Sequence, residues 1–334
     1  MIATVSRMTS MYPISVIMPS FNHRRYLPDR MRSILNQTRQ DFELILLDDA
    51  SVDGSGDFLR AFADRPHTRL IQNSRNSGSP FVQWNRGIQE ARGELIWIAE
   101  SDDVADPEFL KVLSSVLEHN QTVGLAFCRS TRIDEGGHSL MESTAGASDD
   151  RWTHDFQMNG PAAVANLLYL NNTIVSASAV VFRRKIYEEV GQADAGLKLT
   201  GDWLQWSKML LISDVHYVAR ALSQTRIHRV TRRQDTANCG TLELESLIVQ
   251  SRIRDRLSIE RELVQQGAER VAVSWLQAMR AGRFSGSILR HPSFCRKLLQ
   301  TDLRMGIAFA TRWPYAFAVW VVKRIYISLC SSES

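Results

Sequence analysis

The sequence predicts an α/β protein with a mostly parallel central sheet flanked by helices and a helical C-terminal extension. Three observations predict it. Short apolar runs alternate with amphipathic segments in the first half of the chain, acidic residues directly follow two of these runs, and the last third changes to helical periodicity with many basic residues. Strands that alternate with helices form parallel sheets with right-handed crossovers. At 334 residues the chain can hold one large domain or two ordinary ones.

The first hundred residues alternate between strand and helix signals. Ile14 to Met18 is a short β-branched run, and the segment after it places apolar residues from Leu27 to Leu35 on one helical face. The next expected elements, in chain order, are a strand over 42–47, a helix over 54–63, a short strand at 70–71, a helix over 81–91 and a strand over 95–98.

The middle of the chain continues this pattern with one long interruption. Val123 to Cys128 reads as a strand, and Ser176 to Phe182 resumes strand character. Between them, Gly136 to Asn159 is polar and rich in Ser, Asp and Gly, which indicates a loop over the site.

The final third differs in composition from the rest. Leu242 to Met279 has helical periodicity, and Met305 to Cys330 mixes aromatic with basic residues. The longest uncharged run there, Trp313 to Val322, has ten residues, whereas a spanning helix needs about 20. Aromatic residues flanked by cations are typical of an interfacial helix, so the stretch from Arg304 to Arg324 predicts either peripheral membrane contact or a terminal helix packed on the domain.

Charge is divided unevenly along the chain. From Arg220 to the end there are 19 Arg and Lys against 9 Asp and Glu, a balance of +10, so the rest of the chain carries −6. No zinc-finger spacing, basic zipper or aromatic RNA-binding signature accompanies the basic excess. We therefore expect phosphate groups and a membrane surface as its partners, and no nucleic acid.

The cysteines indicate a reducing compartment. Four are present, far apart and without the spacing of metal ligands, and residues 1–11 contain no apolar core of a signal peptide. We expect a cytoplasmic protein. The basic tail gives a second alternative, in which the protein binds the inner face of the cytoplasmic membrane.

Two acidic clusters follow predicted strands. Asp48 and Asp49 follow the strand over 42–47, and Glu100, Asp102 and Asp103 follow the strand over 95–98. Ligands of open α/β sheets bind at the carboxyl ends of strands, and adjacent carboxylates suit Mg²⁺ or Mn²⁺. The alternative is that these acids cap the helices that come next.

Several motifs occur together in a distinctive order. They are the segments 15–22 (SVIMPSFN), 33–38 (SILNQT), 48–55 (DDASVDGS), 85–88 (NRGI), 91–94 (ARGE), 200–203 (TGDW) and 226–228 (RIH). In order and spacing they resemble the family 2 glycosyltransferases, densely from about Pro13 to Leu110.

The resemblance implies a GT-A nucleotide-diphospho-sugar transferase fold and inverting transfer of a sugar to an acceptor hydroxyl. It implies a nucleotide-diphosphate sugar as donor and a divalent cation, Mn²⁺ or Mg²⁺, whose positive charge assists departure of the diphosphate. Asp103 occupies the metal-binding position, Asp49 the position that binds the base, and Phe21 the position that stacks on it. The donor-side positions expected on this basis are Pro19, Phe21, Asp49, Asp102, Arg226 and His228.

Asp202 stands where the family places its general base. A carboxylate within hydrogen-bonding reach of the acceptor hydroxyl can take its proton. Asp202 precedes an amphipathic segment with Trp203 and Trp206, so a helix N-cap is the alternative, and it does not exclude the catalytic role. The two tryptophans suit either sugar stacking or the core, and we expect at least one of them in the core.

The sequence also departs from the family pattern. Gln83 or Trp84 takes the place of an arginine expected near the donor, Glu100 replaces the first aspartate of the metal motif, and Gly201 replaces an acid before the base. Arg226 and His228 begin a basic segment of the kind that closes over the diphosphate in related enzymes, where arginine makes bidentate contacts.

These features predict a GT-A catalytic domain over 1–238, with a nucleotide half near 13–110 and an acceptor half near 120–238, and a helical extension over 239–334. The predicted function is metal-dependent glycosyl transfer to a saccharide or lipid-linked saccharide acceptor in cell-surface polysaccharide or glycolipid assembly. The alternative is a sugar-nucleotide-binding protein without transferase activity.

Overall fold

The computed structural model describes residues 12–140, 150–227, 240–280, 291–301 and 303. The chain divides into two compact units. Unit 1 comprises residues 1–163, 173–195 and 208–228, and unit 2 comprises residues 164–172, 196–207 and 229–334. The segment that carries Asp202 thus groups with the C-terminal helices, although the sequence suggested a boundary at residue 238.

Unit 1 is built on a mixed sheet whose first four strands are all parallel. In spatial order these are β3 (Thr68–Gln72), β2 (Phe42–Asp48), β1 (Ile14–Ser20) and β4 (Leu95–Ile98). β1, β2 and β4 are mostly apolar and buried along their whole length, whereas the edge strand β3 is partly exposed, as expected for a parallel sheet covered on both faces. The carboxyl ends of β2, β1 and β4 therefore lie along one edge.

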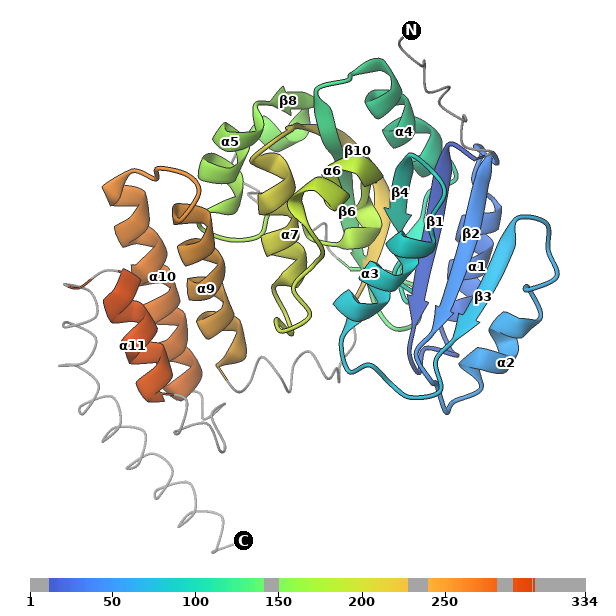
Figure 1. Ribbon diagram of the computed structural model, residues 1–334, viewed down its shortest axis with the longest axis horizontal. Coiled ribbons are helices and arrows are strands. Elements are labelled where there is room, and N and C mark those ends of the chain that lie inside the picture. The colour runs from blue at the N-terminus through green and yellow to red at the C-terminus, as the bar shows by residue number, and fades with distance from the viewer. Residues whose placement is uncertain (1–11, 141–149, 228–239, 281–290, 302, 304–334) are drawn as a thin grey trace, which may run out of the picture. The chain divides into compact units, whose positions relative to one another are not determined.

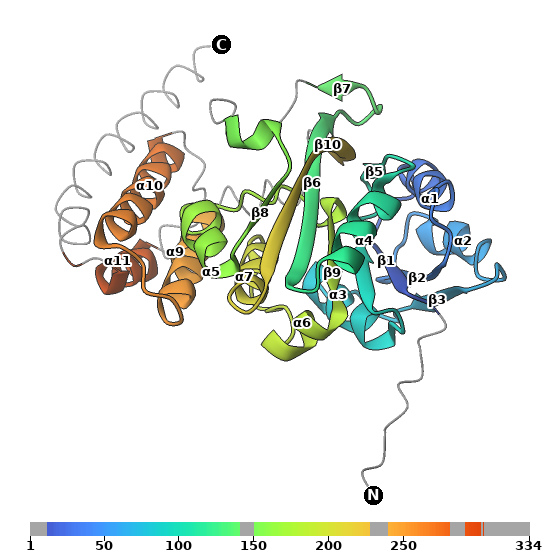
Figure 2. The same cartoon turned by 90° about the horizontal axis from the view of Figure 1, so that it is seen from above.

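The sheet continues beyond β4 with strands of both directions. β9 (Val180–Arg183) runs antiparallel to both β4 and β6 (Val123–Ile133), and β6 pairs in parallel with β10 (Asp214–Arg226). Figure 2 shows β6 and β10 as two long neighbouring strands, with β8 (Phe156–Met158) beside β10. Two short strands complete the sheet, β5 (Val104–Ala105) against β10 and β7 (Ser139–Leu140) against β6.

Helices cover the two faces of this sheet (Figure 1). One face packs on α1 (Leu27–Leu35), α2 (Ser55–Arg60) and α4 (Phe109–His119), which share a single apolar core with the strands. The opposite face of β1 and β2 contacts α3 (Pro80–Glu90). α5 (Gly160–Ala163) and α6 (Arg184–Val190) are the other helices of this unit within the described ranges.

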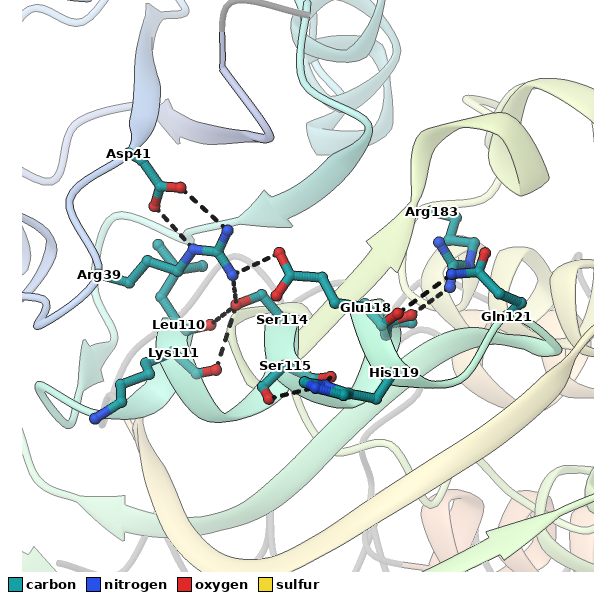
Figure 3. A network of polar contacts seen from close by, with 11 residues as sticks. Arg39, Asp41, Leu110, Lys111, Ser114, Ser115, Glu118, His119, Gln121 and Arg183 are labelled. Carbon is teal, nitrogen blue, oxygen red and sulfur yellow. Dashed lines mark hydrogen bonds and ion pairs between the residues drawn. The ribbon is translucent and has the colours of Figure 1, made fainter. Parts of the chain in front are cut away.

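Polar contacts fix α4, which follows the acidic turn after β4 (Figure 3). Arg39, between α1 and β2, donates to Asp41 at 2.8 Å and to Ser114 Oγ of α4 at 2.7 Å, and pairs with Glu118 at 2.7 Å. Arg183 donates to the Asn120 carbonyl at 3.0 Å just beyond the end of α4. A cation there binds carbonyls that the helix leaves unpaired.

Unit 2 is helical within the described residues. It contains a helical turn over 164–168, the first part of α7 (Gly201–Leu210), and three longer helices, α9 (Thr241–Arg254), α10 (Arg261–Arg280) and α11 (His291–Thr301). Leu247, Trp275 and Leu298 form the centre of its own apolar core. In the parts of the chain that the structure describes, no helix is long and apolar enough to cross a membrane.

Most of the predicted elements are confirmed, with two corrections. The expected loop over 136–159 contains β7 and β8, because β8 finds its pairing partner in β10. The strand expected from Ser176 begins only at Val180, after a 3₁₀ turn over Ala177–Ala179. The aromatic and basic stretch from Arg304 to Arg324 lies outside the described residues.

Gly87 provides a test of the packing between α3 and the sheet. A Cβ there would overlap Ile17 Cγ2 and lie 3.0 Å from Leu47 Cδ1, so Gly87→Ala should lower the free energy of unfolding by about 1–3 kcal/mol. The gain in helix propensity, about 1 kcal/mol, opposes but does not cancel this. Gly267→Ala in α10 is the control, because its Cβ would meet only the side-chain amide of Gln250, at 3.0 Å or more. Thermal melts that rank the two variants equally would contradict this packing argument.

Candidate active site

The predicted donor-side residues of unit 1 lie at one edge of the sheet, in the turns that follow β1, β2 and β4. The turns after β1 and β2 are joined directly, because Asp49 N–H donates to the Ser20 carbonyl at 2.9 Å and Asn22 N–H donates to Ser51 Oγ at 2.9 Å. Asn22 and Ala50 both have positive φ, 53° and 59°, so both turns are sharply folded. Pro19 is buried in β1, and Phe21 follows the strand, half-buried.

Asp49 is the most heavily bonded carboxylate at this edge. It is 4% exposed, and its oxygens accept from the side chains of Asn73 (2.5 Å), Asn76 (3.0 Å), Ser77 (2.8 Å) and Gln83 (2.8 Å) and from Ser77 N–H (2.9 Å). A buried carboxylate needs such donors because nothing else replaces its hydration. Asp49 therefore organises the loop over 73–79, and a nucleotide base would have to share or displace these donors.

Asp103 ties the acidic turn to the far side of the sheet. Its side chain is 4% exposed, and its oxygens accept from Ser176 Oγ at 2.8 Å and from Arg226 N–H at 2.9 Å. It does not cap α4. The N-cap residue of α4 is Glu108, and the carboxylate that bonds the start of this helix is that of Asp106, which accepts from Glu108 N–H at 2.8 Å. The capping alternative thus fails for Asp103, whereas Asp53 does act locally, accepting from Ser55 N–H at 3.0 Å while Gly54 occupies the N-cap position of α2.

The acidic turn concentrates negative charge. Burial raises the pKa of Glu100 to about 8, reinforced by Asp102, and burial with the same neighbour raises the pKa of Asp103 to about 6. Both effects disfavour the charged form, which is the condition that a bound cation relieves.

Arg30 is a residue of this site that the sequence analysis missed. It is fully buried in α1, its guanidinium lies 4.8 Å from the centre of the Trp97 ring, and Nη2 donates to Ser178 Oγ at 3.4 Å. Burial lowers its pKa to about 10, against the attraction of Asp103, Asp102 and Glu100. The available signal was a cation on the helical face of Leu27 and Ile34 that otherwise reads as core.

Arg226 is bound within the protein itself. It is 5% exposed. Nε donates to the Asp102 carbonyl at 2.8 Å, Nη1 donates to the carbonyls of Asp134 and Glu135 at 3.0 and 3.2 Å, and the guanidinium lies 5.0 Å from the centre of the Tyr26 ring. Nη2 pairs with Asp29 Oδ2 at 3.5 Å, so each nitrogen of this guanidinium already has a partner within the protein. His228 lies outside the described residues.

Asp202 belongs to unit 2 and lies in the first turn of α7, which begins one residue earlier, at Gly201. Oδ1 accepts from Trp203 N–H at 2.8 Å and Oδ2 from Asn172 Nδ2 at 3.1 Å. Trp203 and Trp206 are 4% and 0% exposed, so both are core residues and neither offers a face to a sugar. Asp202 itself is half-buried.

The carboxylates of the acidic turn could supply some, but not all, of the ligands of a divalent cation. Within the described ranges, no group of three or more His, Cys, Asp or Glu side chains could hold a metal ion. Asp103 with Asp102 beside it offers one or two carboxylates. Mg²⁺ and Mn²⁺ use such sets where phosphate oxygens and water complete the coordination, so the residues fit a cation that binds together with a diphosphate.

Comparison with known proteins identifies the family. Residues 15–191 match Glycosyl transferase family 2. The chain belongs to this family. This match spans all the donor-side turns and the acidic turn, and it ends before Asp202.

Individual members of family 2 show how far the likeness extends. Glycosyltransferase GlyG of Streptococcus pneumoniae is 37% identical over 100 residues, which are 30% of this chain and only 33% of GlyG. The putative teichuronic acid biosynthesis glycosyltransferase TuaG of Bacillus subtilis is 29% identical over 61% of this chain and 74% of TuaG. The structure of S. aureus TarS 1–349 in complex with UDP-GlcNAc has a TM-score of 0.66 at 16% identity, over 94% of this chain and 91% of that chain. The predicted GT-A fold is confirmed.

The departures from the family pattern lie inside this site. Gln83 donates to Asp49 at 2.8 Å, and Trp84 Nε1 donates to Glu100 at 2.8 Å. Both candidates for the place of the expected arginine therefore bind acidic residues of the two strand-end turns. This family 2 glycosyltransferase holds its own carboxylates with neutral donors at these two positions.

The raised carboxyl pKa values predict how stability depends on pH. Because the folded-state pKa values of Glu100 and Asp103, about 8 and about 6, exceed their ordinary values of 4.5 and 3.8, the folded state binds more protons between about pH 4 and 8. Stability should therefore fall as pH rises through this window when a chelator is present. Glu100→Gln should flatten the fall in melting temperature above pH 7. Asp57→Asn, whose side chain is 81% exposed, should keep the full slope, and a melting temperature that rises from pH 5.5 to 8 would contradict the assignment.

Proposed function

We propose that this chain is an inverting glycosyltransferase that moves a sugar from a nucleotide-diphosphate donor to an acceptor hydroxyl. The observation that carries the proposal is the family 2 match over residues 15–191, which includes the acidic turn at the edge of the sheet. TuaG is a putative teichuronic acid biosynthesis glycosyltransferase, and TarS is a poly(ribitol-phosphate) beta-N-acetylglucosaminyltransferase with a structure in complex with UDP-GlcNAc. These relatives support a UDP-sugar donor and a cell-surface polysaccharide acceptor.

On the donor side, Asp103 and Asp102 would hold Mn²⁺ or Mg²⁺, which when bound neutralises negative charge on the departing diphosphate. Phe21 would stack on the base, Pro19 would support that turn, and Asp49 would accept from the base. Because the loop over 73–79 already supplies donors to Asp49, we propose that this loop adjusts when the nucleotide binds.

On the acceptor side, Asp202 would take the hydroxyl proton. The acceptor oxygen forms a bond to the anomeric carbon as the bond from that carbon to the diphosphate oxygen breaks, so the configuration inverts. The proton goes to the Asp202 carboxylate and the electron pair leaves with the diphosphate. Asn172 and Trp203 N–H hold the carboxylate in one orientation, as a general base requires.

We propose Arg226 and His228 as diphosphate contacts. Arg226 would also have a structural role. The bonds of Arg226 to the carbonyls of Asp102 and Asp134 favour a role in fixing the acidic turn. A cytoplasmic location, and attachment to the membrane face through the basic aromatic stretch 304–324, are proposed from composition. A nucleotide-sugar-binding protein without transfer is the alternative, and measured turnover separates the two.

Asp103→Asn should weaken Mn²⁺-dependent binding of a nucleoside diphosphate at least about tenfold, because it removes a carboxylate that would ligate the metal. Loss of a residue that only hydrogen-bonds a metal ligand already lowers metal affinity by about tenfold or more. Titration calorimetry with UDP and with GDP, each with and without Mn²⁺, measures this. Asp106→Asn is the matched control, because Asp106 lies three residues further on and its carboxylate accepts from Glu108 N–H at the start of α4. Undiminished binding in Asp103→Asn would exclude Asp103 as the metal ligand.

Asp202→Asn should keep nucleotide and Mn²⁺ affinity while transfer falls at least about a hundredfold, because a general base acts only in the transition state. Turnover is measured on a panel of UDP-GlcNAc, UDP-glucose, UDP-galactose and GDP-mannose, with water or a saccharide as acceptor. Nuclear magnetic resonance of the product should show inverted anomeric configuration. Near-normal turnover in the variant, or retained configuration, would defeat the mechanism.

A further inference from the structure

Glu245 in α9 makes an unusual set of contacts with the segment that leads to Asp202. Its carboxylate is 5% exposed and accepts four hydrogen bonds from three consecutive residues. These come from Lys198 N–H (2.7 Å), Leu199 N–H (2.9 Å), Thr200 N–H (3.1 Å) and Thr200 Oγ1 (3.1 Å). All these residues belong to unit 2.

Consecutive backbone N–H groups that converge on one anion form a tight concave binding site. Here the anion is a side chain from more than 40 residues further along the chain. Since charge-assisted bonds are about twice as strong as neutral ones and the carboxylate is shielded from water, the contact fixes the backbone at 198–200. Asp202 lies two residues after Thr200, and Leu204 N–H donates to the Thr200 carbonyl at 3.0 Å, so the same segment starts α7.

We infer that Glu245 is a positioning residue for Asp202, an inference that rests on the proposed role of Asp202 as general base. Glu245 fixes the backbone on which Asp202 stands, and Asn172 orients the carboxylate at 3.1 Å. A base must lie within about 2.6–3.2 Å of the oxygen whose proton it takes, and a misplacement of about 1 Å can cost a hundredfold in rate. The C-terminal helices thus contribute to the reaction through the residue that holds this segment.

Glu243 offers a matched comparison. It lies on the same helix, is 7% exposed, and accepts from Ser274 Oγ of α10 at 2.8 Å rather than from the 198–200 segment. Two residues along an α-helix turn the side chain by about 200°, so the two glutamates serve different neighbours. Glu243→Gln removes the same charge from the same helix without touching the segment before Asp202.

The first experiment measures the contact directly. Hydrogen exchange of a peptide that spans residues 197–204 should be at least about tenfold faster in Glu245→Gln. Weaker hydrogen bonds to these backbone N–H groups lower the free energy of local opening, and the exchange rate rises with the open population. Exchange in Glu243→Gln should equal that of the wild type. Unchanged exchange in Glu245→Gln would overturn the inference, as would equal acceleration in both variants.

The second experiment measures the effect on the reaction. With the nucleotide sugar that the wild type uses best from the panel above, kcat of Glu245→Gln should fall about 10- to 100-fold, while the calorimetric affinity for UDP or GDP with Mn²⁺ stays unchanged. In an Asp202→Asn background the same change should alter the residual rate less than about twofold, because residues that act as one unit are non-additive. If Glu245→Gln does not fold, Thr200→Val removes only the Oγ1 bond and should lower kcat a few-fold.

The outcomes separate this inference from the proposed function. Wild-type turnover in Glu245→Gln, or an equal loss in the Asp202→Asn background, would overturn the positioning role while leaving the base assignment intact. Full turnover in Asp202→Asn would instead show that the proposed base is wrong. A fall in kcat that Glu243→Gln reproduces would indicate a general effect of the helix and would also overturn the inference.

Discussion

Buried carboxylates that must be satisfied by donors from distant parts of the chain are the constraint on which this structure depends. Asp49 and Asp103 are each 4% exposed and Glu245 is 5% exposed. An ionised carboxylate removed from water is strongly unfavourable unless hydrogen bonds replace its hydration. Each of the three therefore collects N–H and O–H donors, and by doing so fixes the loops that supply them.

The two carboxylates of unit 1 divide this task. Asp49 holds the loop over 73–79 against the end of β2, through Asn73, Ser77 and Gln83. Asp103 joins the end of β4 to Ser176 and to the end of β10 at Arg226. The same bonds that make the carboxyl edge of the sheet rigid therefore place its acidic side chains, so stability and the geometry of the candidate donor site have a common origin.

A second set of contacts connects the residues that depart from the family pattern. Trp84 donates to Glu100, Glu100 N–H donates to Ser178 Oγ, and the same hydroxyl accepts from Arg30. Trp97 Nε1 donates to the Ser178 carbonyl at 3.0 Å, and the Arg30 guanidinium lies 4.8 Å from the centre of the Trp97 ring. The longer side chain of Glu100, its tryptophan donor and the buried cation form one network, which explains how an altered acidic motif is accommodated in the core.

The sequence by itself determined the order and type of the elements around the donor site. The apolar run Leu95–Ile98 is a strand with the predicted bounds, β2 extends one residue beyond its predicted end, and α3 begins and ends one residue earlier than predicted, because hydrophobic periodicity and flanking breakers are local signals. Family motifs also indicated which acids stand at the strand ends. The direction of β9 and the pairing of β8 with β10 were decided only in the tertiary structure, because both depend on partners tens of residues away. The same reason hid the roles of Arg30, Arg226 and Glu245. The sequence alone does not show whether a charged side chain will be buried or which backbone groups will surround it. These two features determine the role of the charge.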